Sequence, residues 1–351
     1  MLDSLPDAWL VALIGFGGGV LLGLASRLGR FCTLGAIEDF LYQGSDTRLR
    51  MWGLAIGLAG VLSFLAALLG LLDPSQTIYH LAAFSPLAHV VGGLLFGYGM
   101  SLAGNCGLGA LARAGGGDLR SFVIVLVMGI AAYVALSGPL AQLRVALVDA
   151  TTLHAGARSY ADLIAPGGGV AANAAGLAIC AAFTLAALWS RAFLAERATL
   201  FWAAVVAVAV ATGWIGTQWV ADTGFGAQAV LSHTFTAPLG ETVLFVMTSS
   251  GGGISFGIGS VAGVLAGAFA GSLIKGRFRW EACEDPRELK RQILGAVLMG
   301  GGAVLALGCT IGQGISAMSV LALGAPLTLG AIFIGAMIGL RQLIEGFSSA
   351  S

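Results

Sequence analysis

Three cysteines occupy the same position in a repeated glycine-rich pattern. The pattern is an apolar run with spaced glycines, then a cysteine, two further residues and a glycine. Its copies are GGVLLGLASRLGRFCTLG (18–35), GGLLFGYGMSLAGNCGLG (92–109) and GAVLMGGGAVLALGCTIG (295–312). They place Cys32, Cys106 and Cys309 at one register, and Gly35, Gly109 and Gly312 three residues later. A weaker copy, TFTAPLG (234–240), has Thr236 where a cysteine would stand.

These positions have the chemistry to bind an anion through weak hydrogen-bond donors. A thiol is a weak hydrogen-bond donor, and burial in apolar surroundings keeps it protonated. A thiolate would repel an anion, so we expect neutral cysteines. Backbone N–H groups at helix starts after each cysteine would add donors and a partial positive charge. The simpler alternative is that each cysteine is a small apolar side chain in a membrane helix.

Three neighbouring residues join the candidate binding or translocation site. Asn105 precedes Cys106, and Thr310 follows Cys309. Arg30, two residues before Cys32, either attracts the anion or only orients its helix in a membrane.

The other cysteines carry weaker signals. Cys180 lies in AGLAICAAF and is expected to pack as a small apolar residue. Cys283 lies in the charged segment RWEACEDP, where it is a site residue, contacts a partner or has no role. With no CxxC pair, no zinc spacing and scattered histidines, we expect no metal site. We also expect no cofactor and no enzymatic activity.

Composition places the chain in a membrane. Of its 351 residues 58% are hydrophobic and 10% are charged, with a mean hydropathy of +0.93. Uncharged runs of about 18 residues are long enough to cross a bilayer, whereas 238–250 is too short and is expected to be re-entrant or interfacial. The net charge of zero gives no indication of a nucleic-acid partner. Expected spans lie near 8–28, 51–72, 86–104, 121–140, 169–189, 200–220, 254–274, 293–308 and 326–346.

Basic residues set the expected orientation. Lys and Arg gather in alternate connections, most densely in 275–291, and are absent from 73–85 and 222–236. Cytoplasmic loops carry an excess of these residues, so we expect an N-terminus outside and 275–291 in the cytoplasm.

The expected fold is an all-α polytopic membrane protein of about nine transmembrane helices, with inverted repeats and re-entrant loops rich in cysteine and glycine. One repeat half covers 1–140, a connecting segment with one span covers 141–199, and the second half covers 200–351. The alternative is that the glycines form a GxxxG-like packing face followed by an ordinary loop.

At the cysteine turns the sequence resembles the YeeE/YedE family of bacterial membrane proteins, which take up thiosulfate or related sulfur compounds. The resemblance rests on GRFCTLGAIEDF (29–40), GYGMSLAGNCGLGAL (97–111), GRFRWEACED (276–285) and ALGCTIGQGISAMS (306–319). It implies an inner-membrane importer whose cysteines hand the ion inward, with functional cysteines falling on Cys32, Cys106, Cys283 and Cys309. It also implies a small cytoplasmic sulfur-carrier partner. The middle motif departs from the pattern, because Gly107 stands where threonine is usual.

Three functions stay open at this point. The first is an importer of thiosulfate or a related sulfur anion. The second is a thiol-redox membrane protein, although no cysteines lie close together in sequence. The third is a membrane subunit that delivers a sulfur species to a cytoplasmic sulfurtransferase.

Overall fold

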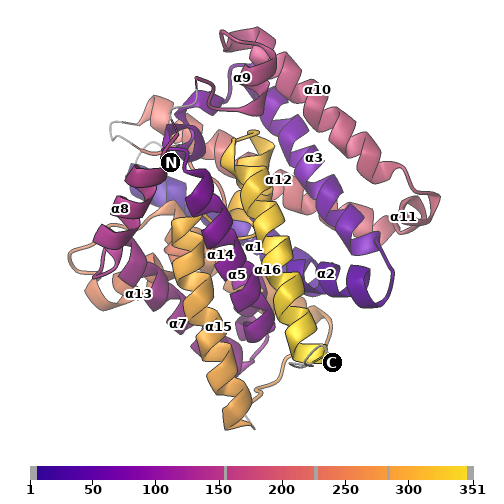
Figure 1. Ribbon diagram of the computed structural model, residues 1–351, viewed down its shortest axis with the longest axis vertical. Coiled ribbons are helices and arrows are strands. Elements are labelled where there is room, and N and C mark those ends of the chain that lie inside the picture. Colours follow the sequence, from indigo (N-terminus) through magenta and orange to yellow (C-terminus); the bar gives the residue numbers. More distant parts are fainter. Residues whose placement is uncertain (1–5, 154–155, 225–227, 283–284, 346–351) are drawn as a thin grey trace.

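The computed structural model describes residues 6–153, 156–224, 228–282 and 285–345, and this part of the chain is all helical apart from three isolated β-bridges (Figure 1). The longer helices are α1 (Asp7–Leu28), α3 (Thr47–Leu68), α5 (Pro86–Ala103), α7 (Leu119–Leu136), α10 (Gly169–Leu188), α12 (Arg197–Thr223), α14 (Phe256–Ile274), α15 (Pro286–Leu305) and α16 (Gly324–Glu345). The shorter ones are α2 (Thr33–Tyr42), η2 (Pro74–Gln76), α4 (Ile78–Leu81), α6 (Gly107–Gly115), α8 (Ala141–Thr151), α9 (Tyr160–Ile164), α11 (Arg191–Ala195), α13 (Ala237–Thr248) and the π-helical turn η3 (Gly312–Ala317).

Eight helical segments within the described residues are long and apolar enough to cross a membrane. They correspond to eight of the nine expected spans, with ends shifted by a few residues. The ninth expected span, 293–308, falls on α15, which begins with the charged stretch Arg287–Arg291. Helix α13, on the expected short segment, has 12 residues and is too short to cross.

Most of the chain is built from four helix–turn–helix units. Unit 1 is α1–α2–α3, unit 2 is α5–α6–α7, unit 3 is α12–α13–α14, and unit 4 is α15–η3–α16. Helix α1 packs against α12 and α14 of unit 3, and α5 packs in the same way against α15 and α16 of unit 4. Likewise α3 packs against α12, and α7 packs against α15. Unit 1 therefore pairs with unit 3 as unit 2 pairs with unit 4.

Glycines let these helices approach backbone to backbone. In α1 Gly15, Gly19 and Gly23 face α14, and in α14 Gly259, Gly263 and Gly267 face α1. A Cβ atom added at any of these six positions would clash with a backbone carbonyl oxygen of the other helix. In lipid, where apolar burial gives little gain, such close contact is a main source of helix association.

Units 2 and 4 are also packed through close glycine contacts. A Cβ atom at Gly99 would lie 2.6 Å from the carbonyl oxygen of Gly295, and one at Gly302 would lie 2.7 Å from that of Gly92. These are glycines of the repeated sequence pattern. They fix how α5 lies on α15, and so where the two cysteine turns meet.

The segment between units 2 and 3 adds an outer helix. Helix α10 packs against α3, as the two parallel ribbons in Figure 1 show. Cys180 of α10 is 3% exposed and lies in an apolar cluster with Phe64 and Ala172. The cluster lies apart from the main core, which contains Cys106 and Cys309.

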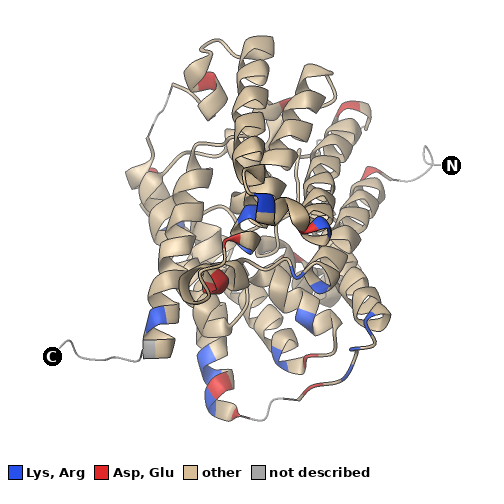
Figure 2. Ribbon diagram, turned by 90° about the vertical axis from the view of Figure 1, so that its right-hand side faces the viewer, with Lys and Arg blue, Asp and Glu red and all other residues tan. Residues whose placement is uncertain are grey.

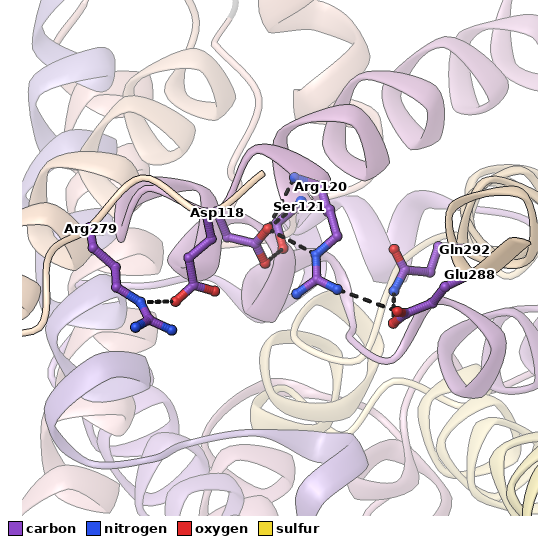
Figure 3. A network of polar contacts seen from close by, with 7 residues as sticks. Asp118, Arg120, Ser121, Arg279, Glu288 and Gln292 are labelled. Carbon is purple, nitrogen blue, oxygen red and sulfur yellow. Dashed lines mark hydrogen bonds and ion pairs between the residues drawn. The ribbon is translucent and has the colours of Figure 1, made fainter. Parts of the chain in front are cut away.

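Charged residues are unevenly distributed along the molecule. Most blue segments in Figure 2 lie in the lower half, at the end that holds the connection before α15. This connection is joined to the start of α7, because Leu119 N–H donates to Glu281 O over 3.1 Å and Glu281 N–H donates to Gly117 O over 3.0 Å. Figure 3 shows the side chains beside this joint, where Arg120 pairs with Asp118 at 3.5 Å and with Glu288 at 3.4 Å.

The glycine contacts predict that alanine substitutions at Gly17 and Gly19 of α1 have very different effects on stability. Gly19→Ala should destabilise the folded protein by about 1–3 kcal/mol, because the new methyl group overpacks the α1–α14 contact. Gly17, where an added Cβ meets nothing within 4 Å, is the matched control. Gly17→Ala should be neutral or stabilise by up to about 1 kcal/mol through helix propensity. The measurement is thermal unfolding of both purified variants in detergent, and equal stability of the two would contradict this packing.

Candidate functional site

Each of the three cysteines follows a helix that ends in the same way. Two residues before the cysteine the backbone is left-handed, with φ of 55° at Arg30, 73° at Gly104 and 59° at Leu307. The turn stops the preceding helix and extends the chain. A short helical segment then starts directly after Cys32 and Cys106, and two residues after Thr310. The repeated sequence register is therefore also a repeated backbone geometry.

Two of these left-handed positions are not glycine. This conformation costs an L-residue about 1–2 kcal/mol. Glycine would avoid the cost at Arg30 and Leu307, as it does at Gly104. Arg30 and Leu307 each line a cavity of the protein, and the two cavities are described below. Their presence at a strained position points to a role for the side chains themselves.

Cys106 lies at the junction of units 1 and 2. The residue is 2% exposed, and its Sγ accepts a hydrogen bond from Gly109 N–H at 3.5 Å. The Thr33 hydroxyl, next to Cys32 in the chain, lies 4.0 Å from the same sulfur. Cys32 and Cys309 both lie within electrostatic range of Cys106. The fold thus brings together the three cysteines that the sequence placed at one register.

Cys309 lies at the junction of units 3 and 4. It is 1% exposed, and its Sγ accepts a hydrogen bond from Phe235 N–H at 3.4 Å. The hydroxyl of Thr234 lies 3.7 Å from this sulfur. The weak fourth copy of the motif therefore does meet a cysteine turn, but through Thr234 and Phe235 and not through Thr236.

Cys32 opens into a cavity of about 300 Å³, which we call the basic vestibule. Cys32 is half-buried, and Asn105, Gly35 and Gly109 also line this space. Four arginines surround it, namely Arg27, Arg30, Arg48 and Arg113. Arg48 pairs with Asp39 at 3.1 Å, whereas the other three form no ion pair within the described residues. Glu38 also lines the vestibule, but the three arginines without an ion pair outnumber it, so an anion that entered would meet net positive charge.

A second cavity, of about 290 Å³, lies near Cys309, and we call it the Tyr79 vestibule. Tyr79, Leu307 and Gln313 line it on the side of the cysteine turn. Burial raises the pKa of the Tyr79 phenol, which therefore stays protonated and able to donate. Burial also lowers the pKa of His80, so this lining imidazole is neutral at pH 7. Arg158 is the basic side chain of fixed charge in the described lining.

The two vestibules lie at opposite ends of α5. His89, in its first turn, lines the Tyr79 vestibule, and Gly104, just after its last residue, lines the basic vestibule. At 1.5 Å per residue these positions are about 22 Å apart. Asn105 and Gly109, on either side of Cys106, line the basic vestibule, and Leu307 and Gln313, on either side of Cys309, line the Tyr79 vestibule. The two buried thiols therefore lie between the cavities, and we call the region around them the constriction.

The glycines that follow Cys32 and Cys309 make room for a neighbouring polar side chain. A Cβ atom at Gly35 would clash with the guanidinium of Arg48. At Gly312 it would lie 2.6 Å from Thr234 Oγ1 and 3.0 Å from the Tyr79 hydroxyl. Gly35 and Gly312 therefore let polar groups of other segments reach the cysteine turns, whereas a Cβ atom at Gly109 would only meet Asn105 of its own turn in ordinary contact, at 3.4 Å.

Several polar atoms around the constriction are buried without a hydrogen bond of normal geometry to a described residue. They are the Thr236 and Thr310 hydroxyls and Oε1 of Gln313. Thr310 also lies beside Cys106. Buried polar groups are nearly always paired with protein or with water, so these atoms are available to a polar ligand.

The sequence pattern indicates some of the residues around the cysteine turns but not others. Thr33, Thr234, Tyr79 and Gln313 were not among the expected site residues. Thr33, Thr234 and Gln313 lie within the quoted motifs, and so their positions alone could have drawn attention to them. Nothing local in the sequence marks Tyr79. Cys283 lies outside the described residues.

A family model described as sulphur transport matches residues 28–338. The chain belongs to the sulphur transport family. It is 29% identical over 317 residues to a protein of Escherichia coli (strain K12) named thiosulfate transporter TsuA, covering 85% of this chain and 84% of that protein. A protein of Spirochaeta thermophila with the same name is 25% identical over 326 residues, covering 90% of this chain and 93% of its own length. The resemblance to the YeeE/YedE family is thereby confirmed, and the chain is a multi-pass membrane protein of sulphur transport.

Accessibility of the thiols tests this geometry. In variants that keep one cysteine and have alanine at the others, a small maleimide should label Cys32 fastest, because only Cys32 among these residues is half-exposed in a cavity. Cys106 and Cys309 should react much more slowly, as should the Cys180 control in its apolar cluster. The rates are measured by mass spectrometry of the purified variants. Labelling of Cys106 as fast as Cys32 would contradict a buried constriction.

Proposed function

We propose that this protein imports thiosulfate, or a closely related sulfur-containing anion, across the bacterial inner membrane. The observation that carries the proposal is the convergence of three cysteine turns between two cavities at opposite ends of α5. The anion would pass from the Tyr79 vestibule to Cys309, then to Cys106, and then to Cys32 in the basic vestibule. Membership of the sulphur transport family and the names of the two relatives support thiosulfate as the substrate.

The proposed membrane arrangement counts α15 as the ninth span. The apolar part of α15, from Ile293 on, would cross the membrane, and its charged first turns would lie in the cytoplasm. The basic vestibule then faces the cytoplasm and the Tyr79 vestibule faces outward. Units 1 and 2 run opposite to units 3 and 4, which makes them inverted repeats. Helices α2, α6 and α13 and the turn η3 would be re-entrant, with their backbone polar groups buried in protein.

The constriction suits a substrate that must bind and leave again. The sulfurs of Cys106 and Cys309 accept weak contacts of 3.4–4.0 Å from N–H and hydroxyl groups. A protonated thiol can donate to a passing anion at little cost, because the contacts that it gives up are weak. The unpartnered hydroxyl of Thr310 would add one more donor beside the thiols, whereas Oε1 of Gln313 can only accept and its Nε2 already donates to Leu307 O. Among the residues that the structure describes, no side chain with a full positive charge lies beside the two thiols, so the anion would not be trapped there.

Charge at the two ends favours inward passage. Arg158 would attract the anion to the Tyr79 vestibule, and the denser arginine set of the basic vestibule would draw it onward. Release into the cytoplasm would follow by exchange with solvent anions. A small cytoplasmic sulfur-carrier protein is a proposed recipient, with the basic segment 275–291 as its contact surface.

Uptake by cysteine variants tests the path. In proteoliposomes Cys106→Ala and Cys309→Ala should abolish uptake of labelled thiosulfate, because each removes the only thiol at its step of the constriction. Cys180→Ala is the matched control and should leave uptake nearly unchanged. Folding of each variant is checked by gel filtration and thermal unfolding. Equal uptake by all three variants would refute the cysteine path.

The preference for thiosulfate over sulfate is a separate prediction. Sulfate resembles thiosulfate but lacks the terminal sulfur, and a hydrogen bond left unmade by the wrong ligand costs about 1–3 kcal/mol. Two such contacts correspond to a preference of roughly tenfold or more for thiosulfate, at about 1.4 kcal/mol per tenfold. Cys309→Ser should reduce this preference more than it reduces binding of oxyanions in general. The measurement is competition by sulfate against labelled thiosulfate, and equal competition in the wild type would rule out selection by thiols.

A further inference from the structure

A second basic cavity, of about 540 Å³, lies beside the basic vestibule at the ends of α1 and α14. Its lining comprises four cationic residues and one hydroxyl, from Arg27, Arg30, Ser272, Lys275 and Arg277. None of these four cations forms an ion pair within the described residues. Such convergence on one cavity differs from the scattered basic residues that orient a membrane protein.

The cationic groups are held in place by neutral partners. Arg27 Nε donates to Ser272 Oγ over 2.7 Å. Lys275 Nζ donates to the carbonyl oxygens of Arg27 at 2.8 Å and Leu28 at 3.2 Å. Arg30 is positioned by its left-handed backbone. Two of the cationic side chains are thus anchored by bonds that leave their positive charge uncompensated.

Two carboxylates that influence Arg27 are held by other partners. Glu281 and Asp118 lie within electrostatic range of Arg27. The Glu281 carboxylate pairs with Arg279 at 2.5 Å, and the Asp118 carboxylate accepts from Ser121 Oγ at 2.9 Å and pairs with Arg120 (Figure 3). These contacts use the carboxylates that could otherwise neutralise the cavity.

The cavity keeps a positive charge after its surroundings are counted. It lies at the C-terminal ends of two helices, and each helix end contributes about half a negative elementary charge. Four cations against two such ends leave about three positive charges. In agreement, the pKa of Lys275 is lowered by burial and then by Arg277, Arg30 and Arg27. A bound anion would relieve this repulsion.

Guanidinium, ammonium and hydroxyl donors around one space suit a tetrahedral oxyanion with several acceptor oxygens. We propose that this cavity binds one phosphate group, either from the headgroup of an anionic lipid or as free inorganic phosphate. Basic pockets between helices on the cytoplasmic side of membrane proteins commonly bind such groups. Because Arg27 and Arg30 line both cavities, a bound phosphate would also lower the positive potential of the basic vestibule. Only this last consequence rests on the proposed import function.

Binding is tested without transport, so that failure of the import proposal cannot be mistaken for failure of this one. The full-length protein, the double variant Lys275→Gln/Arg277→Gln and the control Lys290→Gln/Arg291→Gln are compared. The control removes equal charge from α15, outside the cavity. In detergent, inorganic phosphate should raise the unfolding temperature of wild type and control. The cavity variant should bind at least about tenfold more weakly, equivalent to a loss of about 1.4 kcal/mol.

A second experiment distinguishes a lipid headgroup from free inorganic phosphate. The three proteins are placed in phosphatidylcholine nanodiscs with or without phosphatidylglycerol, and retained lipid is counted by native mass spectrometry. Retention of phosphatidylglycerol by wild type and control, but not by the cavity variant, identifies a lipid headgroup. A response to inorganic phosphate alone identifies the free anion. The proposal is wrong if neither probe binds, or if the control loses binding as much as the cavity variant does.

Discussion

Close backbone contact between glycine-bearing helices is the constraint on which the rest of this structure depends. In a membrane the surrounding lipid is as apolar as the side chains, so helices gain little by burying them and associate through close packing. The glycines of α1 and α14, and those of α5 and α15, bring carbonyl oxygens of one helix against the other. This contact sets how far along each helix the neighbouring turn begins, and thereby aligns the cysteine turns.

The second constraint is that a chain broken inside a membrane must satisfy its backbone polar groups within protein. Left-handed residues end the helices before Cys32, Cys106 and Cys309, and short helical segments follow. Thiols serve at these breaks because they accept weak contacts from N–H and hydroxyl groups at 3.4–4.0 Å. In the proposed transport function, contacts this weak would let the thiols exchange partners.

Charge is arranged around this neutral constriction. In the basic vestibule and the adjoining second basic cavity, hydroxyl and carbonyl oxygens accept hydrogen bonds from the cations more often than carboxylates do. Near these cavities Asp118 pairs with Arg120 and Glu281 pairs with Arg279. Backbone hydrogen bonds of Glu281 with Gly117 and Leu119 join the loop before α15 to the start of α7.

The sequence alone determined the membrane helices, the short segment at α13 and the common register of the three cysteines, because hydropathy and repeated spacing are local properties. It indicated a weak fourth copy of the motif at 234–240, but not that Thr234 and Phe235 of this copy would contact Cys309. It also gave no sign that Tyr79 or Arg48 would reach the glycines of the motifs. Only the tertiary structure decided these contacts and the pairing of unit 1 with unit 3, because helix-to-helix register depends on packing between segments far apart in the chain.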